Sequence, residues 1–335
     1  MSTPPAVTPD EFREKFTALQ EELGRVIVGQ QDVVLGLLVG FFAGGHVLLE
    51  GVPGLGKTLL AKSFAKTLGL SFNRVQCTPD LMPADVVGTE MVTDRDGHKA
   101  FEFSRGPVFT QILLTDEINR ATPKTQSALL EAMAEHQVTV AGKTYKLEEP
   151  FFVIATQNPL EMEGVYSLPE AQLDRFMFRV LVTYPTPEEL GRILRQTTVA
   201  EPPSIKQILP DAKAAPWILQ ARHLVRDVLV ASSIEEYVVR MVSATHPGGP
   251  AAGELAQRFI RYGASPRGAQ AILLGAKVLA LVRGRVNVSF EDVDQAALLA
   301  LNHRIILSFE AEAERRQPLD LLRELLAPLQ HTAVK

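Results

Sequence analysis

The segment at residues 51–58 limits the possible folds of this chain more than any other feature. It reads Gly-Val-Pro-Gly-Leu-Gly-Lys-Thr, which fits the phosphate-loop pattern of a glycine, any four residues and then Gly-Lys-Thr. In such a loop, backbone N–H groups turn inward around a triphosphate, and the following helix offers its positive N-terminal end to the same anion. The alternative, a chance match in a glycine-rich turn, is expected about once per hundred chains of this length.

The sequence on both sides of the loop favours the phosphate-loop interpretation. Residues 46–50 predict a short buried strand before it, and residues 58–68 predict a helix after it. In this setting the Lys57 ammonium contacts the outer phosphates of ATP, and the Thr58 hydroxyl ligates Mg²⁺. The loop residues that we expect to bind the nucleotide are Pro53, Gly54, Leu55, Gly56, Lys57, Thr58 and Leu59.

A pair of acidic residues follows the strand predicted at residues 112–115. Asp116 is placed to hold the magnesium ion, together with Thr58. Glu117 is placed to polarise an attacking water molecule, which indicates a hydrolase more than a kinase. Two surface acids after a core strand are the alternative, and the nearby phosphate loop makes it the weaker one.

Short apolar runs predict an α/β fold with a parallel sheet and helices on both faces. Residues 137–147 predict a β-hairpin with a glycine-containing turn. The uncharged run at residues 33–49 is near the lower length limit of a spanning helix, but glycines interrupt it, so we expect a helix and then a strand rather than a membrane span. The other predicted strands are residues 72–77, 112–115, 151–156 and 177–184.

The pattern changes at Thr186, where a capping residue, a first-turn proline and a glutamate predict a helix start. We place a domain boundary here, with an α/β domain at residues 1–185 and a helical domain at residues 186–335. Thr8 and Glu11 predict a similar capping box at the first helix. Further helix starts are expected near Pro216, Ser233, Ser265 and Ser289.

Composition narrows the choice of partners and compartment. The net charge is −5, with 34 Lys and Arg against 39 Asp and Glu, so no global positive field attracts a nucleic acid. A single cysteine, Cys77, forbids an internal disulfide and a cysteine-based metal cluster. The polar first residues lack the pattern of a secretory signal, so we expect a cytoplasmic protein.

With these motifs the chain resembles the AAA+ ATPases, and in particular their MoxR family, over nearly its whole length. The resemblance implies a phosphate-loop α/β domain followed by a smaller, all-α lid domain. Val28 and Gly29 are similar to the segment that lines the adenine pocket. Residues 115–121 resemble the family's extended second motif, and Asn158 resembles the sensor-1 residue that holds the water opposite the γ-phosphate.

Two arginines match functional positions of the family. Arg175 resembles an arginine finger, which enters the site of the neighbouring subunit; a local ion pair with Asp174 or Glu170 is the alternative. Arg267, in the first turn of a predicted helix, resembles the sensor-2 arginine; a solvated side chain is the alternative. The lid of this subgroup is repositioned, so whether Arg267 acts on its own or the neighbour's nucleotide stays open.

The segment at residues 79–107 is longer than a simple crossover and resembles the helix-2 insertion of a subgroup that contains MoxR proteins, magnesium chelatase motor subunits and the MCM helicases. The hairpin at residues 137–147 resembles their pre-sensor-1 hairpin. The resemblance places both at the central face of a ring.

The resemblance implies an ATPase that assembles into a homo-oligomeric ring, expected to be a hexamer. Its implied output is remodelling or maturation of a partner protein, such as cofactor or metal insertion, with a von Willebrand factor A domain protein as a candidate partner. Two rivals remain. One is a nucleic-acid motor like the MCM helicases, and the other is a scaffold that binds ATP without substantial turnover.

Overall fold

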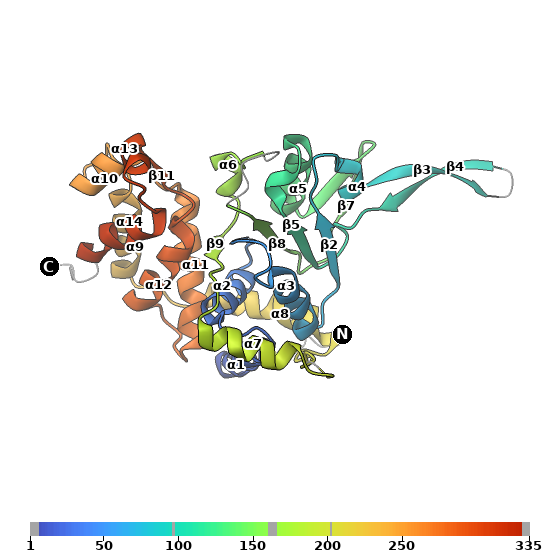
Figure 1. Ribbon diagram of the computed structural model, residues 1–335, viewed down its shortest axis with the longest axis horizontal. Coiled ribbons are helices and arrows are strands. Elements are labelled where there is room, and N and C mark those ends of the chain that lie inside the picture. The colour runs from blue at the N-terminus through green and yellow to red at the C-terminus, as the bar shows by residue number, and fades with distance from the viewer. Residues whose placement is uncertain (1–6, 96–97, 160–165, 202, 330–335) are drawn as a thin grey trace.

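The central sheet has five strands in the order β2-β5-β8-β1-β9, and every neighbouring pair is parallel. The computed structural model describes residues 7–95, 98–159, 166–201 and 203–329 (Figure 1). The strands are Phe72–Gln76 (β2), Ile112–Asp116 (β5), Phe152–Gln157 (β8), Val47–Glu50 (β1) and Phe178–Leu181 (β9).

Alternate residues of each strand face two different hydrophobic layers, because successive side chains of a strand point to opposite faces. Leu49 packs in one buried cluster with the N-terminal helices, whereas Leu48 and Leu113 pack in the other. The α/β class expected from the sequence is therefore confirmed. The first face carries α1 (Pro9–Val26), α2 (Gln31–Phe42), α3 (Lys57–Leu68) and α8 (Asp211–Asp227), and the second carries α4 (Pro83–Val87) and α5 (Pro123–Glu135).

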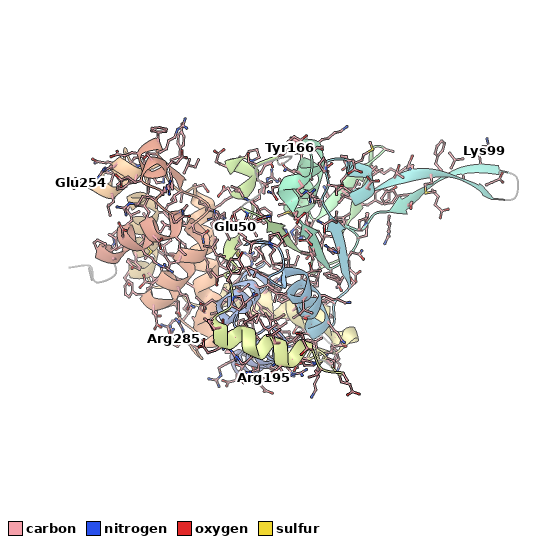
Figure 2. The ribbon with its side chains drawn as sticks, in the orientation of Figure 1. Glu50, Lys99, Tyr166, Arg195, Glu254 and Arg285 are labelled. Carbon is pink, nitrogen blue, oxygen red and sulfur yellow. The ribbon has the colours of Figure 1, made fainter. Side chains whose placement is uncertain are left out.

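Two antiparallel hairpins interrupt the alternation of strands and helices. The longer one, β3 (Gly88–Arg95) with β4 (His98–Arg105), projects far from the body of the molecule, and Lys99 lies near its tip (Figures 1 and 2). It belongs to the insertion predicted at residues 79–107, whose residues 96–97 lie outside the described part. The shorter one pairs β6 (Gln137–Val140) with β7 (Lys143–Lys146), inside the predicted range 137–147.

The C-terminal helices gather beside the sheet, next to β9 and α2 (Figure 1). They include a short antiparallel ribbon that was not predicted, β10 (Ile260–Tyr262) with β11 (Ile306–Leu307). The helices of this region are α9 (Ser232–Ala244), α10 (Glu254–Phe259), α11 (Pro266–Val282), α12 (Phe290–Leu301), α13 (Phe309–Ala313) and α14 (Pro318–Leu326). The remaining elements are α6 (Glu170–Leu173), α7 (Pro187–Thr197) and the 3₁₀ turns Ile118–Arg120 and Ala327–Leu329.

Two predicted capping boxes differ in outcome. At α7 the Thr186 hydroxyl accepts from the Glu189 N–H at 3.3 Å, and the Glu189 carboxylate accepts from the Thr186 N–H at 2.8 Å, so the box is complete. At α1 Thr8 caps the helix, but the Glu11 carboxylate accepts from the Trp217 indole N–H at 2.8 Å instead. A tertiary contact with α8 has replaced the local one.

The helix start predicted at Pro216 is wrong, because α8 begins at Asp211 and Pro216 lies inside it. A proline there removes one intrahelical hydrogen bond. Burial of an apolar stripe on the same helix, Ala214, Ile218 and Ala221, offsets that loss.

The uncharged run at residues 33–49 contributes most of α2 and β1, as expected. Among the described residues, no helix combines the length and apolar character that crossing a membrane requires.

Candidate active site

The phosphate-loop segment joins the carboxyl end of β1 to the start of α3. Gly54 and Gly56 have φ values of +84° and +79°, a backbone region that side-chain-bearing residues rarely adopt. A Cβ at either position would meet no atom within 4 Å, so the φ angle, not lack of space, requires glycine. The Lys57 ammonium is buried and donates hydrogen bonds to the carbonyl oxygens of Gly51 and, at 3.2 Å, Val52.

The Thr58 hydroxyl and the Asp116 carboxylate lie together beside the loop, and both are oxygen ligands of the type that Mg²⁺ prefers. The Thr58 hydroxyl donates to Asp116 Oδ2 at 3.3 Å, and Thr156 donates to Asp116 Oδ1 at 2.6 Å. Magnesium sites use one or two protein oxygens with waters and phosphates, so this donor set fits the ion. No cluster of three or more His, Cys, Asp or Glu side chains that could hold another metal occurs in the described part of the chain.

A third residue, Arg74 of β2, contacts the same carboxylate and was not foreseen. Its Nη2 lies 2.7 Å and its Nε 3.2 Å from Asp116 Oδ2. The strands β2 and β5 are neighbours, with Gln76 opposite Asp116. The available signal was the alternation of Arg74 and Gln76, two residues apart and hence on one face of the same strand.

The Glu117 carboxylate is held by two side chains. Gln76 Nε2 and Arg120 Nη1 each lie 3.0 Å from Glu117 Oε2. The residue has a φ of +56°, and its N–H donates to Thr156 Oγ1 at 2.8 Å. Arg120 therefore pairs with the predicted water-polarising residue.

Asn158 directly follows β8, the strand between β5 and β1. Because carboxyl ends of parallel strands meet at one edge of a sheet, Asn158 lies at the same edge as the phosphate loop and Asp116. Asn158 is buried, and its main-chain carbonyl oxygen accepts from Asn119 Nδ2 at 3.5 Å. The structure therefore brings the loop, both acids and Asn158 together at this carboxyl edge.

Val28 and Gly29 line a cavity of about 750 Å³ between the sheet domain and the C-terminal helices. The neighbouring Gln30 donates from Nε2 to the Leu55 carbonyl at 3.0 Å, which ties this segment to the phosphate loop. A Cβ at Gly29 would lie 2.4 Å from the Glu189 carboxyl carbon, so α7 packs directly on the glycine.

Arg175 and Arg267 lie at the opposite, amino edge of the sheet. Both line a cavity of about 220 Å³ with His46, which directly precedes β1, and Arg175 itself precedes β9. The phosphate loop, in contrast, follows the carboxyl end of β1. The structure therefore does not bring either arginine to the phosphate loop of its own chain.

The contacts of the two arginines bear on the alternatives that the sequence left open. Arg175 is exposed and donates from Nη1 to the Leu130 carbonyl at 3.1 Å. It forms no ion pair with Asp174 or Glu170 in the described structure. Arg267 Nη1 lies 3.6 Å from Asp174 Oδ2, with 56% of its side chain exposed, so it is paired but only loosely.

Two buried groups near these edges are structural. Burial lowers the pKa of His46 to about 4. Its Nδ1 accepts from the Val153 N–H and its Nε2 lies 3.0 Å from the Met133 carbonyl, which fixes a neutral ring with the proton on Nε2. Burial raises the pKa of the Cys77 thiol to about 12, so this thiol is unreactive.

Comparison with known proteins agrees with this arrangement. Residues 46–178 match the family model described as the ATPase family associated with various cellular activities, and residues 252–325 match an AAA lid domain. The chain is 44% identical to chaperone MoxR1 of Mycobacterium tuberculosis, covering 91% of this chain and 79% of that protein. It is 30% identical to protein MoxR of Methylorubrum extorquens, with 93% and 94% covered. The structure of a proposed ATPase from Cytophaga hutchinsonii superimposes with a TM-score of 0.85 at 40% identity, covering 95% of both chains.

Proposed function

Since this chain belongs to the MoxR family of AAA+ ATPases, we propose that it hydrolyses ATP with Mg²⁺ at sites shared between neighbouring copies of itself. We propose a closed ring, hexameric as the family resemblance implies, with an α/β domain at residues 1–185 and a lid at residues 186–335. Its location in the cytoplasm belongs to the same proposal.

One observation carries the shared-site proposal. The phosphate loop lies at the carboxyl edge of the sheet, whereas Arg175 and Arg267 lie at the amino edge. A head-to-tail arrangement of copies places the amino edge of one chain against the carboxyl edge of the next. In this proposal both Arg175 and Arg267 act on the neighbour's nucleotide.

The roles of the carboxyl-edge residues follow from their positions. Backbone amides of the loop and Lys57 bind the phosphates, and Val28 and Gly29 contact the base at the rim of the larger cavity. Glu117 orients and polarises the attacking water, assisted by Asn158. Arg175 stabilises the charge that develops on the transferred phosphoryl group.

Thr58 and Asp116 would hold the magnesium ion, which supplies charge neutralisation of the phosphate oxygens when bound. Arg74 now donates to the same Asp116 oxygen that Thr58 contacts. We infer that Arg74 shares Asp116 with the ion and balances its charge when the ion is absent.

Remodelling of protein partners as the output is supported by one relative, MoxR1, which is named a chaperone. Maturation of a partner by cofactor or metal insertion, with a von Willebrand factor A domain protein involved, is our expectation from the family. The alternative function, a nucleic-acid motor, loses support from the charges of the hairpin β6–β7. There Lys143 pairs with Glu90 at 3.2 Å, and this hydrogen bond raises the pKa of the lysine while Glu90 offsets its charge.

A subunit-mixing assay tests the shared site. Glu117→Gln subunits lack the water-polarising carboxylate but keep Arg175, and Arg175→Ala subunits keep a complete carboxyl edge. Each variant alone should hydrolyse ATP poorly. In an equal mixture about a quarter of the parent rate should return, since half the subunits keep a working site and half of those receive an intact neighbour. No recovery in rings that contain both variants would overturn the proposal.

The scaffold rival is tested separately by calorimetry on nucleotide-free protein. We expect magnesium-dependent binding of ATP by the parent chain and its loss in Lys57→Ala. Binding without turnover in the parent would favour the scaffold.

A further inference from the structure

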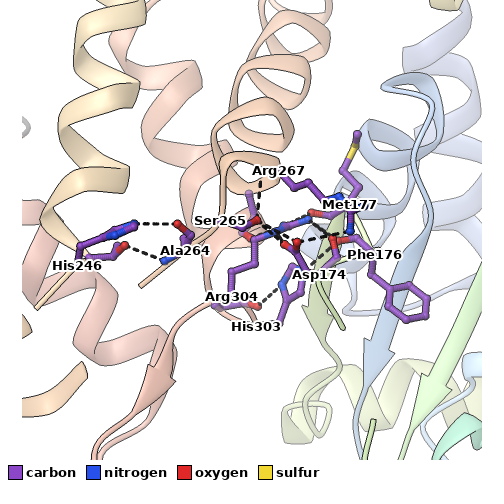
Figure 3. Close-up of polar contacts among 12 residues, drawn as sticks. Asp174, Phe176, Met177, His246, Ala264, Ser265, Arg267, His303 and Arg304 are labelled. Atoms are coloured by element: carbon purple, nitrogen blue, oxygen red, sulfur yellow. Dashed lines mark hydrogen bonds and ion pairs between the residues drawn. The ribbon is translucent and has the colours of Figure 1, made fainter. Parts of the chain in front are cut away.

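The segment that carries Arg175 is held by the lid. The Arg304 side chain is 2% exposed and lies at the end of the turn that joins α12 to β11. Its Nε donates to Asp174 Oδ1 at 2.8 Å, and its Nη2 donates to the carbonyls of Asp174 at 3.1 Å and Phe176 at 2.7 Å. Its Nη1 donates to the Met177 carbonyl at 2.9 Å. One guanidinium thus binds the backbone on both sides of Arg175 (Figure 3).

Neighbouring lid residues complete the attachment. His303 Nε2 lies 3.0 Å from the Phe176 carbonyl, and Asn302 Nδ2 donates to the Arg179 carbonyl at 2.9 Å. The Ser265 hydroxyl, at the N-terminus of α11, donates to the Asp174 carboxylate at 2.8 Å. Residues 174–179 are therefore fixed to the lid at several points along the chain, whereas the Arg175 side chain itself is exposed.

The same lid helix borders the larger cavity. Gln295, Leu298 and Leu299 of α12, and Asn302 at its C-cap, line that cavity together with Val28 and Gly29. The C-terminal half of α12 thus faces the space proposed for the base of the chain's own nucleotide. The same end of the helix leads through Asn302 and His303 into Arg304.

We propose that Arg304 is a positioning residue for the arginine finger: it locks residues 174–177 to the lid, so that Arg175 moves with α12 and reaches the neighbouring site at the correct place. The proposal rests on the proposed function, because it requires Arg175 to act on the neighbour's nucleotide. The forked guanidinium is essential to it. A lysine keeps the charge but has one nitrogen, which cannot serve acceptors spread over three residues.

The asymmetry between donor and acceptor subunits provides the test. The donor is Glu117→Gln, which supplies Arg175, and the acceptor is Arg175→Ala, which supplies the working site. Arg304→Lys is added to the donor in one mixture and to the acceptor in another. With the substitution in the donor, the recovered rate should fall about 10²-fold, the cost of a reacting group displaced by roughly 1 Å. With the substitution in the acceptor, the recovered rate should stay near a quarter of the parent's.

Equal losses of the recovered rate in the two mixtures would show a general structural role of Arg304 and overturn the proposal. An unchanged rate in both mixtures would overturn it as well. No recovery in the mixture without Arg304→Lys would instead overturn the shared site itself, so the two failures are distinguishable. In the Arg304→Lys single variant, kcat should fall while KM for ATP stays within about twofold, since the substitution removes only transition-state stabilisation.

Arg285→Lys is the matched control. Arg285 binds the fully buried Asp292 at 2.8 and 2.9 Å within the lid. The same substitution there should disturb lid packing without the donor–acceptor asymmetry. If Arg304→Lys does not fold, Asp174→Asn replaces it, because this variant weakens the contact to Arg304 Nε and keeps the backbone acceptors. It should show the same asymmetry, with a loss of about 10-fold in the donor.

Discussion

The two edges of the central sheet are built in different ways. The carboxyl edge is assembled from short contiguous motifs, each of which follows a strand: the loop after β1, Asp116 and Glu117 after β5, and Asn158 after β8. The amino edge brings together side chains from distant parts of the chain, with His46, Arg175, Arg267 and Arg304 contributed by both domains.

This difference means that one edge is set by local backbone geometry and the other by packing between domains. The carboxyl edge needs only the parallel sheet to align its motifs. The amino edge needs the lid to be docked, because Asp174 binds Arg304, Ser265 and Arg267, all from the lid. Substitutions at the two edges should therefore behave differently, and four measurements test this.

The largest effect is expected at the amino edge, from Arg175→Ala. An arginine finger is worth about 10³ to 10⁵ in turnover, so kcat should fall by that factor. ATP affinity should change little, because the residue does not touch the nucleotide of its own chain. A large loss of affinity in isolated subunits would instead place Arg175 at its own site. Arg195→Ala on α7, an exposed arginine whose substitution leaves both edges untouched, is the control for the loss of a surface charge.

Glu117→Gln should have the next largest effect and acts at the carboxyl edge. Loss of the base should lower kcat about 10² to 10⁴-fold. Unlike Arg175→Ala, this defect should stay in the subunit that carries the substitution, which subunit mixing measures. Hydrolysis at the parental rate would contradict the role of Glu117 in polarising the attacking water.

A smaller effect concerns pH and the buried His46 of the amino edge. The imidazole has a pKa near 6.5 when unfolded and about 4 when folded, so the unfolded chain binds a proton that the folded chain does not. The contribution of the neutral His46 to the free energy of unfolding should therefore be fully present above pH 6.5. It should fall by about 3 kcal/mol as the pH drops to 4. His136, Arg222 and Glu149 face this ring and shape its pKa, but burial dominates.

Urea unfolding at pH 7 and pH 5 measures this loss, and His46→Gln should flatten the profile. The profile should not become fully flat, because burial also lowers the pKa of His303 well below its usual value. An unchanged pH profile in the variant would show that His46 is not the titrating group.

The smallest effect is expected for Thr156→Val. The Thr156 hydroxyl accepts from the Glu117 N–H and donates to Asp116, so the variant should lose roughly 1–2 kcal/mol of unfolding free energy. Thr67→Val is the control, because its hydroxyl donates only within α3, to the Ser63 carbonyl. Equal losses in the two variants would mean that the bridge between the two acids adds nothing.

The same contrast explains what could be predicted from the sequence. The strands, the loop and the acids were found because each is encoded by neighbouring residues. Arg74 was missed because its contact with Asp116 depends on which strands are neighbours, and strand order is not local. The segment at residues 302–305 resembles part of the MoxR lids, but the role of Arg304 could not be predicted for the same reason, since its partners lie 130 and 127 residues away.

Local signals failed where tertiary contacts overrode them. Glu11 leaves its expected cap for the Trp217 indole, and Pro216 is tolerated inside α8 because the helix buries an apolar stripe. The insertion at residues 79–107 was recognised by its length. Its form, a hairpin that stands away from the body, was not predicted (Figure 1).

The hairpin of β3 and β4 has the shape of a lever arm (Figure 1). Its base is fixed by stacking of Phe103 on Tyr145, with ring centroids 4.1 Å apart, and by the Glu90–Lys143 pair, whereas the outer pair Val92 and Phe101 is 57% and 74% exposed. Eight residues per strand give an arm of about 26 Å. A rotation of roughly 10° at the base would move the tip by about 5 Å, close to the rise of one helical turn.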